Sequence, residues 1–344
     1  MGLFFLMENE DIPKEHLRLI YGEIVRGSSY FYSPAFGEVI IKHLTQQDTE
    51  LLDVKKLKYK TKAEEKGLPT EEERVQDLIK EKIWSKEKED QIEASKSFIS
   101  RMQDTQKKMV LKSERQRVQK DIEDESDKLE KILVERVDLI GLTSEEYSNK
   151  KVNDYYIYVS LFKDREFKQP LFSEEEFDEV SEKDLSNIIY NFNKVSKKFK
   201  ERTIKRIAVS HFFLNNFYLC KDNPFIYYGK PVVELSYHQA DLFSFGRYYK
   251  QLMQDMKSPL TNEMMDDPDK ITEQYDIEQN KEKVLKETSK EGEATTVVGA
   301  TKEDLEALGV SAEQNVGETV NLNDEIQKKG GVMTMEEIMK LHGY

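Results

Sequence analysis

The stretch that decides the fold contains two segments, IEASKSFISRMQDTQKKM (residues 92–109) and VQKDIEDESDKLEKILVERVDL (residues 118–139). In the first segment, residues spaced alternately three and four apart are Ile92, Ser95, Ile99, Met102, Gln106 and Met109. The same spacing in the second segment selects Val118, Ile122, Glu125, Leu129, Ile132, Arg136 and Leu139. This alternation places side chains along one seam of a helix, as in coiled coils. We therefore predict a long, coiled-coil-like helical hairpin over residues 85–140.

The turn between the two helices of the hairpin is predicted from the polar residues between them. Residues 112–116 contain no apolar side chain, so we place the turn of an antiparallel hairpin near Ser113. Because no glycine or proline marks this turn, one continuous helical rod is the alternative. Gln106, Glu125 and Arg136 occupy seam positions and weaken the seam as an independent zipper. We expect the hairpin to depend on contacts with the rest of the fold or with a partner.

The part before the hairpin, residues 1–84, is predicted to be mixed α/β. A first helix is expected over residues 13–24, where apolar residues recur on one side. Residues 29–34 and 36–44 are rich in aromatic and β-branched side chains, which predicts a small β-hairpin turned at residues 34–37. Thr45, followed three residues later by Asp48, predicts the start of the next helix.

A further helix of this part is predicted from its capping residues. Thr70 and Glu73 form a capping box directly after Pro69, and the helix that they open ends near the only tryptophan, Trp84. A large indole at a helix end is most often buried, so we expect Trp84 to anchor this end in a core.

Residues 141–254 are rich in aromatic side chains, and we predict that they form the helical core. Three further capping boxes are predicted to start helices here: Thr143 with Glu146, Ser173 with Glu176, and Ser236 with Gln239. Residues 204–219 are apolar nearly all round, which predicts one buried helix. Residues 222–231 are expected to form an ordered loop, and a last helix is predicted over residues 237–252.

The remaining residues, 255–344, are predicted to be a flexible acidic tail. They contain 21 acidic residues and 10 lysines, and so carry most of the formal net charge of −14. With few large apolar groups, such a stretch cannot offset the entropy lost on ordering. One short island, capped by Thr301, has Leu305 and Leu308. The other, near the end of the chain, is capped by Thr334 and Glu337.

The second island predicts an amphipathic helix that binds a partner protein. Its candidate partner-binding residues are Met335, Ile338, Met339, Leu341 and Tyr344. Short isolated helices are marginally stable, so a weakly helical terminus that binds nothing is the alternative.

No stretch of the sequence indicates a catalytic or cofactor site. The single cysteine, Cys220, excludes an internal disulfide framework and is expected to be a small buried residue. None of the five histidines has a metal-ligand spacing, and we interpret His211 and His238 as core residues. No phosphate-binding glycine loop and no nucleophile elbow occurs. We therefore predict a protein that is not an enzyme, with no cofactor and no metal.

Two basic clusters, residues 55–60 and residues 197–206, support an alternative. In this alternative, the second cluster contacts nucleic acid, and the chain is an accessory protein in a nucleic-acid transaction with an acidic regulatory tail. Its lysines and arginines alternate with Phe199 and Ile204, so a basic helix face is the simpler interpretation. The net charge of −14 also argues against extensive binding of DNA or of an anionic membrane.

The apolar run near the start of the sequence is too short for a signal peptide. It covers residues 3–7, has no basic residues before it, and is followed at once by Glu8 and Glu10. No run approaches the length of about 20 apolar residues that spans a bilayer. We expect the protein to stay in the cytoplasm and to have no membrane partner.

Two stretches resemble proteins of large tailed bacteriophages. Residues 33–48, SPAFGEVIIKHLTQQD, contain a strand with one basic residue, then Leu-Thr, then an acidic residue that opens a helix. This pattern is similar to the beginning of tail-assembly chaperones and related structural proteins of these phages. Residues 222–231 and 237–249 resemble uncharacterised proteins of the same phages.

The resemblance implies a protein that holds or organises other subunits and has no catalytic residues. A chaperone of this kind shields an aggregation-prone helical partner, such as a tape-measure protein, until assembly. We therefore expect protein partners among tail or other virion subunits, a location in the host cytoplasm or in the virion, and an oligomeric state that the sequence leaves open.

Overall fold

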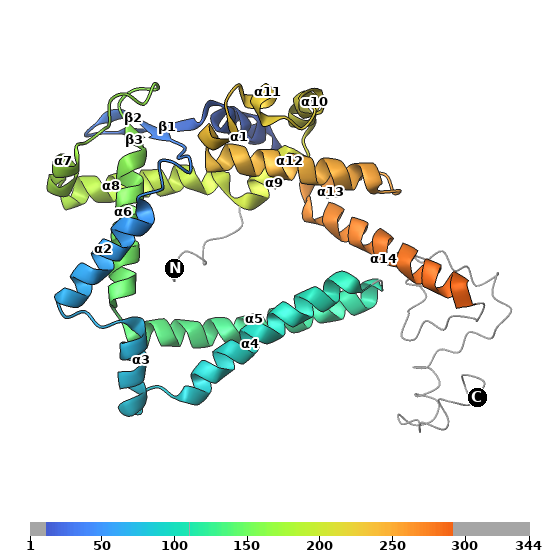
Figure 1. The fold of residues 1–344 in the computed structure, drawn as a ribbon, viewed down its shortest axis with the longest axis horizontal. Coiled ribbons are helices and arrows are strands. Elements are labelled where there is room, and N and C mark those ends of the chain that lie inside the picture. Colours follow the sequence, from blue (N-terminus) through green and yellow to red (C-terminus); the bar gives the residue numbers. More distant parts are fainter. Residues whose placement is uncertain (1–11, 110, 292–344) are drawn as a thin grey trace. The chain divides into compact units, whose positions relative to one another are not determined.

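The computed structural model describes residues 12–109 and 111–291 of the chain (Figure 1). It divides into two compact units, of which the first contains Met1–Lys96 and Asp127–Tyr275 and the second contains Ser97–Ser126 and Asp276–Tyr344. The predicted terminal residues Met335, Ile338, Met339, Leu341 and Tyr344 lie outside the described residues, as does the island at residues 301–308.

The described part is mainly helical with one small antiparallel sheet, which confirms the predicted fold class. The elements before the helical hairpin are α1 (Lys14–Arg26), β1 (Ser28–Ser33), β2 (Gly37–Lys42), α2 (Leu52–Glu65) and α3 (Glu71–Lys80). The hairpin itself is α4 (Lys86–Lys108) and α5 (Lys112–Ile140).

The elements that follow the hairpin are mostly short helices. They are α6 (Ser144–Ser160), β3 (Leu161–Phe162), α7 (Glu174–Glu179), α8 (Glu182–Ser196), η1 (Lys197–Phe199), α9 (Glu201–Ala208), α10 (His211–Leu219), α11 (Pro224–Tyr228), η2 (Val232–Glu234), α12 (Tyr237–Asp255), α13 (Asn262–Asp266) and α14 (Asp269–Glu291).

The predicted β-hairpin is present as β1 and β2, and β3 extends it to three strands in the order β1-β2-β3. Tyr30 lies opposite Ile40, and Ile41 lies opposite Leu161 of β3. Gly37 closes the turn with a φ of 76°, a conformation that favours glycine. The third strand was not predicted, because two residues that follow a helix directly are too few to show a strand pattern.

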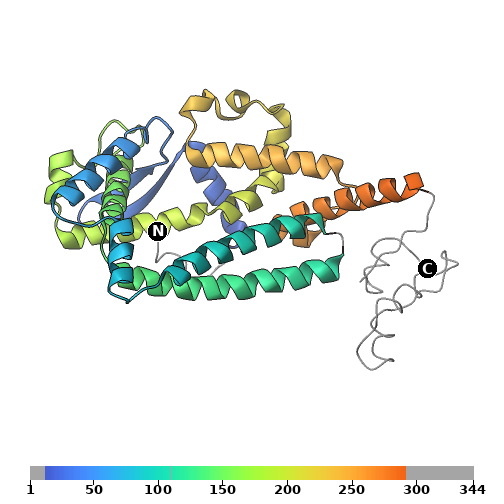
Figure 2. The same ribbon diagram turned by 60° about the horizontal axis from the view of Figure 1, so that its bottom comes forward.

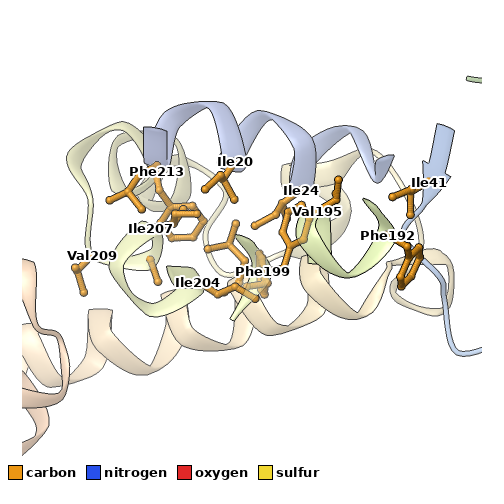
Figure 3. Packing of buried hydrophobic residues seen from close by; sticks show 14 of the residues in the cluster. Ile20, Ile24, Ile41, Phe192, Val195, Phe199, Ile204, Ile207, Val209 and Phe213 are labelled. Atoms are coloured by element: carbon orange, nitrogen blue, oxygen red, sulfur yellow. The ribbon is translucent and has the colours of Figure 1, made fainter. Parts of the chain in front are cut away.

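The main core lies where α1, α8, α9 and α12 meet beside the sheet. Figure 3 shows Ile20 and Ile24 of α1 facing Val195, Phe199 and Ile207 of the segments from α8 to α9. The helical periodicity of α1 places its apolar residues on this one side, as predicted.

A second, smaller core joins α3 to the base of the helical hairpin. Val75, Leu78 and Ile92 are buried in it with Trp84, whose Nε1 donates a 2.7 Å hydrogen bond to Glu89. The capping box of Thr70 starts α3 as predicted. The prediction that Trp84 anchors the end of this helix is therefore confirmed.

The two arms of the helical hairpin run antiparallel (Figure 2). In the first unit, Lys88 at the start of α4 pairs with Glu135 near the end of α5 at 2.6 Å. In the second unit, the side chain of Gln106 donates to the carbonyl of Arg115 at 3.1 Å. The alternative of one continuous rod is therefore wrong, and α5 begins at Lys112, slightly before the predicted turn at Ser113.

The polar seam residues have defined partners in the structure. Arg136 donates to Glu71 at 2.6 Å and to Glu89 at 2.7 Å. Gln106 also donates to the side chain of Gln119 at 3.1 Å. The base of the hairpin is therefore bonded to α3, in agreement with the expectation that the hairpin depends on the rest of the fold or on a partner.

Residues 204–219 form two helices, α9 and α10, where the sequence predicts one. The hydroxyl of Ser210 donates to the carbonyl of Arg206 at 2.7 Å, and the chain turns at this point. As a result, one side of α10 faces solvent: His211 is exposed and Leu219 is 79% exposed. The interpretation of His211 as a core residue is wrong for this reason.

The boundaries of three other predictions also change. Thr45 and Asp48 form a turn closed by a hydrogen bond from the Thr45 backbone at 2.9 Å, and α2 begins only at Leu52. The predicted loop at residues 222–231 contains α11. Residues 262–291, predicted as part of the flexible tail, form α13 and α14, because Ile271 is fully buried in the main core.

No helix among residues 12–109 and 111–291 combines the length and the apolar character that a membrane crossing requires.

Candidate protein-binding surface

The chain segment from the end of α10 to η2 exposes several large apolar side chains, which we call the α11 surface. Its members are Tyr218, Leu219, Phe225, Ile226, Val232 and Val233. Their exposed fractions range from 43% for Tyr218 to 79% for Leu219. Scattered single apolar residues are normal on a protein surface, and it is the number of them in this one short segment that makes it a candidate binding site.

The helix α11 at the centre of this surface forms for local reasons. The side chain of Asn223 accepts a 2.9 Å hydrogen bond from the backbone nitrogen of Phe225, which caps the helix. Pro224 occupies the first turn, where its missing N–H has no cost. Gly229 ends the helix with a φ of 70°.

Two tyrosines fix α11 to the core. The hydroxyl groups of Tyr21 and Tyr227 lie 2.6 Å apart, and the Tyr228 hydroxyl donates to the carbonyl of Gln239 at 3.0 Å. Burial raises the pKa of both Tyr227 and Tyr228, and the bond with Tyr21 adds to the effect at Tyr227. Both phenols therefore stay neutral and serve as anchors.

The rings of these tyrosines lie on a cluster of buried phenylalanines. Tyr227 is 5.6 Å from Phe213 and 6.1 Å from Phe243, measured between ring centroids. Because the two tyrosines face this cluster, Phe225 and Ile226 on the same short helix point to solvent, with exposed fractions of 58% and 61%. The helix thus displays two apolar side chains on a firmly packed support.

The bend that leads into α11 is also fixed. Lys221 and Asp222 have φ values of 50° and 59°, a left-handed conformation that costs a residue with a side chain roughly 1 kcal/mol. Lys250 of α12 holds the bend, because its ammonium group donates to both carboxylate oxygens of Asp222 at 2.9 Å. The same ammonium group lies 5.6 Å from the ring of Tyr218.

A buried polar cluster beneath α1 is the arrangement that most resembles catalytic machinery. The Ser29 hydroxyl donates to Glu23 at 2.8 Å and lies 2.8 Å from Nε2 of His43. In a catalytic triad the histidine stands between the acid and the serine, whereas here the serine stands in the middle. Ser29 is also only 2% exposed, so a substrate has no access to its oxygen.

The two histidines of this region are packed as neutral rings. Burial, together with the neighbouring His238 and Arg26, lowers the pKa of His43 to about 3. Burial lowers the pKa of His238 to about 4, and its ring stacks on Phe199 with centroids 4.7 Å apart. These contacts agree with the interpretation of His238 as a core residue.

Cys220, the only cysteine, is buried as expected. Its Sγ lies 2.9 Å from the carbonyl oxygen of Phe217 in the last turn of α10.

The basic cluster at residues 197–206 makes several contacts within the chain. Lys198 pairs with Glu23 at 3.3 Å, and Lys205 pairs with Asp269 at 2.7 Å. Arg206 is buried and donates to the carbonyl of Ile12 at 2.7 Å. These three side chains therefore bond to α1, to α14 and to Ile12.

The first basic cluster, on α2, is used in a similar way. Lys55 pairs with Glu174 at 2.9 Å, and Lys60 pairs with Glu145 at 2.9 Å. Within the described ranges, no group of three or more histidine, cysteine or carboxylate side chains could hold a metal ion.

The α11 surface was not predicted from the sequence. The signal is the run Phe225-Ile226-Tyr227-Tyr228, in which four large apolar side chains follow one another in a segment interpreted as a loop. A helix of five residues is too short to show a helical period in the sequence. Only the tertiary contacts of the two tyrosines show that Phe225 and Ile226 face outward.

No protein-family model, no curated protein and no solved structure matches this chain.

Proposed function

We propose that this chain is a non-enzymatic protein of phage virion assembly, similar in role to tail-assembly chaperones, and that it binds other structural subunits. The α11 surface carries the proposal. Phe225, Ile226 and Leu219 present large apolar side chains on a support that the buried aromatic cluster keeps rigid. Binding energy at protein interfaces concentrates in such aromatic and aliphatic anchors, because a preorganised anchor loses little entropy on binding.

The proposed client is an aggregation-prone helical subunit of the tail, such as a tape-measure protein. An amphipathic helix offers apolar side chains three and four residues apart, which is the chemistry that an exposed apolar surface can cover. The complex forms in the host cytoplasm, and the protein then either enters the virion or is released.

The alternative, an accessory role in a nucleic-acid transaction, receives less support from the geometry. Its basic face needs lysines and arginines that are available to phosphates. Lys198, Lys205 and Arg206 instead bond to Glu23, to Asp269 and to a backbone carbonyl.

The test of the proposal is affinity capture of the tagged full-length chain from phage-infected cells, with mass spectrometry of the proteins that co-purify. The informative variant is Phe225→Ser with Ile226→Ser, which removes apolar surface from exposed positions and leaves the buried tyrosines intact. The matched control is Val54→Ser with Leu57→Ser on α2, where the two side chains are 63% and 67% exposed.

We expect wild type and control to recover tail or other virion subunits, and the α11 variant to recover at least about tenfold less of them. Equal recovery by all three proteins would show that the α11 surface does not bind the client. Recovery of polymerase or repair proteins together with nucleic acid, sensitive to salt, would favour the alternative instead.

A further inference from the structure

We infer that the client helix on the α11 surface carries an acidic side chain, and that Arg247 of α12 binds its carboxylate group. The inference rests on the proposed function, because it specifies the chemistry of the client that the α11 surface binds. It assigns a role to a polar pocket that lies beside this surface.

The polar pocket has a volume of about 450 Å³ and is lined by one side of α12 together with Asp222. Its α12 residues include Arg247, Lys250, Gln251 and Gln254, whose side chains all end in N–H groups. They follow one another at spacings of one to four residues, and the positions 247, 251 and 254 lie on the same side of a helix. The pocket is therefore rich in hydrogen-bond donors.

The charges of this pocket leave one cation without a partner. Both carboxylate oxygens of Asp222 accept from the ammonium group of Lys250 at 2.9 Å, so these two charges neutralise each other. Arg247 is exposed, and no carboxylate among residues 12–109 and 111–291 forms an ion pair with it. The pocket can therefore still bind an anion through Arg247, whereas both oxygens of Asp222 are already bonded.

The pocket and the α11 surface meet at Asp222. This residue lines the pocket and directly precedes Asn223, which caps α11. The ammonium group of Lys250, which also lines the pocket, lies 5.6 Å from the ring of Tyr218, a member of the α11 surface. One bound segment can therefore cover apolar side chains of this surface and place a polar side chain in the pocket.

A carboxylate is the anion that suits this pocket on a protein client. The guanidinium group of Arg247 presents its N–H groups in a planar fork that matches the two oxygens of a carboxylate. A basic side chain at the same place would be repelled, which excludes helices of the wrong charge. An apolar surface alone accepts many amphipathic helices, so Arg247 would supply the specificity that Phe225 and Ile226 lack.

The test measures the binding of synthetic helical peptides to the full-length chain by fluorescence anisotropy. Every peptide is held helical by a hydrocarbon staple and has the same apolar stripe. The peptides differ at one position beside the stripe, which is Glu, Gln or Lys and is moved along the helix within the set.

The protein variants are Arg247→Gln and Arg247→Glu. The matched control, Lys183→Glu, replaces an exposed lysine of α8 outside the pocket and changes the net charge as much as Arg247→Glu does. The variant Phe225→Ser with Ile226→Ser reports whether the peptides bind the α11 surface.

We expect wild type and control to bind the best glutamate peptide at least about tenfold more tightly than its lysine counterpart. Arg247→Gln should remove this preference, and Arg247→Glu should reverse it. Added salt should reduce the preference of the wild type, because it screens exposed charges.

Equal affinities of the three kinds of peptide for wild type would overturn the inference, as would a preference that Arg247→Glu leaves unchanged. The α11 surface would remain a binding site in that case if the Phe225 and Ile226 variant still lost the peptides. Failure of every peptide to bind would also refute the inference. Self-association of wild type in sedimentation velocity, lost in Arg247→Glu, would replace the acidic client by a second copy. The proposed function is decided separately, by whether the capture experiment recovers virion subunits.

Discussion

Replacing Gly246 by alanine is a sensitive test of the aromatic core that supports α11. Gly246 lies inside α12, and a Cβ atom at this position would stand 2.7 Å and 2.8 Å from two ring atoms of Phe213 and 3.1 Å from Phe217. Both rings are fully buried and contact each other with centroids 5.1 Å apart. The rings must therefore move, and their neighbours with them.

The size of the effect follows from two opposing terms. Alanine favours a helix over glycine by about 1 kcal/mol, which acts to stabilise the variant. Overpacking of a dense core typically costs about 1–3 kcal/mol, so we expect Gly246→Ala to lower the free energy of unfolding by up to about 2 kcal/mol. The matched control is Gly22→Ala in α1, where the nearest atoms belong to the end of the exposed Arg26 side chain at 3.2 Å. At this position only the higher helix propensity of alanine acts, so the free energy of unfolding of the control should rise by up to about 1 kcal/mol.

The assay is urea unfolding followed by near-ultraviolet circular dichroism, which reports on the packing of aromatic rings. Fluorescence of Trp84 provides a separate signal, because this residue belongs to the smaller core. The reasoning is refuted if Gly246→Ala stabilises the protein as much as Gly22→Ala. Such a result would mean that the rings of Phe213 and Phe217 can move aside without lowering the free energy of unfolding.

Three other predictions follow from contacts described above. The low pKa values of His43 and His238 mean that the unfolded chain takes up protons below pH 6.5 while the folded chain does not, down to about pH 4. The contribution of these two histidines to the free energy of unfolding should therefore be fully present above pH 6.5 and decrease by about 1.4 kcal/mol per pH unit for each histidine as the pH falls. His238→Phe should remove the part of this pH dependence that comes from His238, measured by urea unfolding at several pH values. Lys221→Gly should raise the free energy of unfolding by about 0.5–1 kcal/mol, because glycine adopts the left-handed backbone without strain; a loss measured by urea unfolding would contradict this. Arg136→Met should cost about 1–2 kcal/mol and shift the Trp84 emission, since Glu89 bonds to both side chains; an unchanged spectrum would count against the proposed coupling.

Local signals in the sequence predicted several helix starts, although Thr45 and Asp48 form a turn instead of opening α2. The capping boxes at Thr70, Ser173 and Ser236 form, because each depends only on residues within one turn. At Thr143 only one bond of the predicted box forms, from the backbone nitrogen of Glu146 to the Thr143 hydroxyl at 3.2 Å. The helical hairpin was predicted for a similar reason, since its periodicity is a property of each arm. The polar residues at seam positions indicated that the hairpin needs further contacts, but they did not show that Arg136 bonds to Glu71 of α3.

Features set by distant contacts were not predicted. The break at Ser210 has no glycine or proline, and apolar periodicity continues across it. The helix α14 has only a few apolar residues, and the buried Ile271 fixes its start to the core. The α11 surface was not predicted for the same reason. Phe225 points to solvent because Tyr227 and Tyr228 on the same helix are bonded to distant partners, Tyr21 and the backbone of Gln239.

The side chain of Gln239 has a consequence for how the protein is made. It is fully buried and donates to the carbonyls of Ile24 and Val25 at 3.0 Å and 2.9 Å, across a sequence separation of 215 residues at Ile24. The first helix therefore leaves the ribosome long before its partner in α12 exists. At about 5–20 residues per second, its apolar face waits tens of seconds for burial, while the helical hairpin, whose contacts are closer in sequence, can form during translation. Slow synthesis, low temperature or a stalled ribosome would thus expose α1 first, and nascent chains would need protection at their N-terminal end.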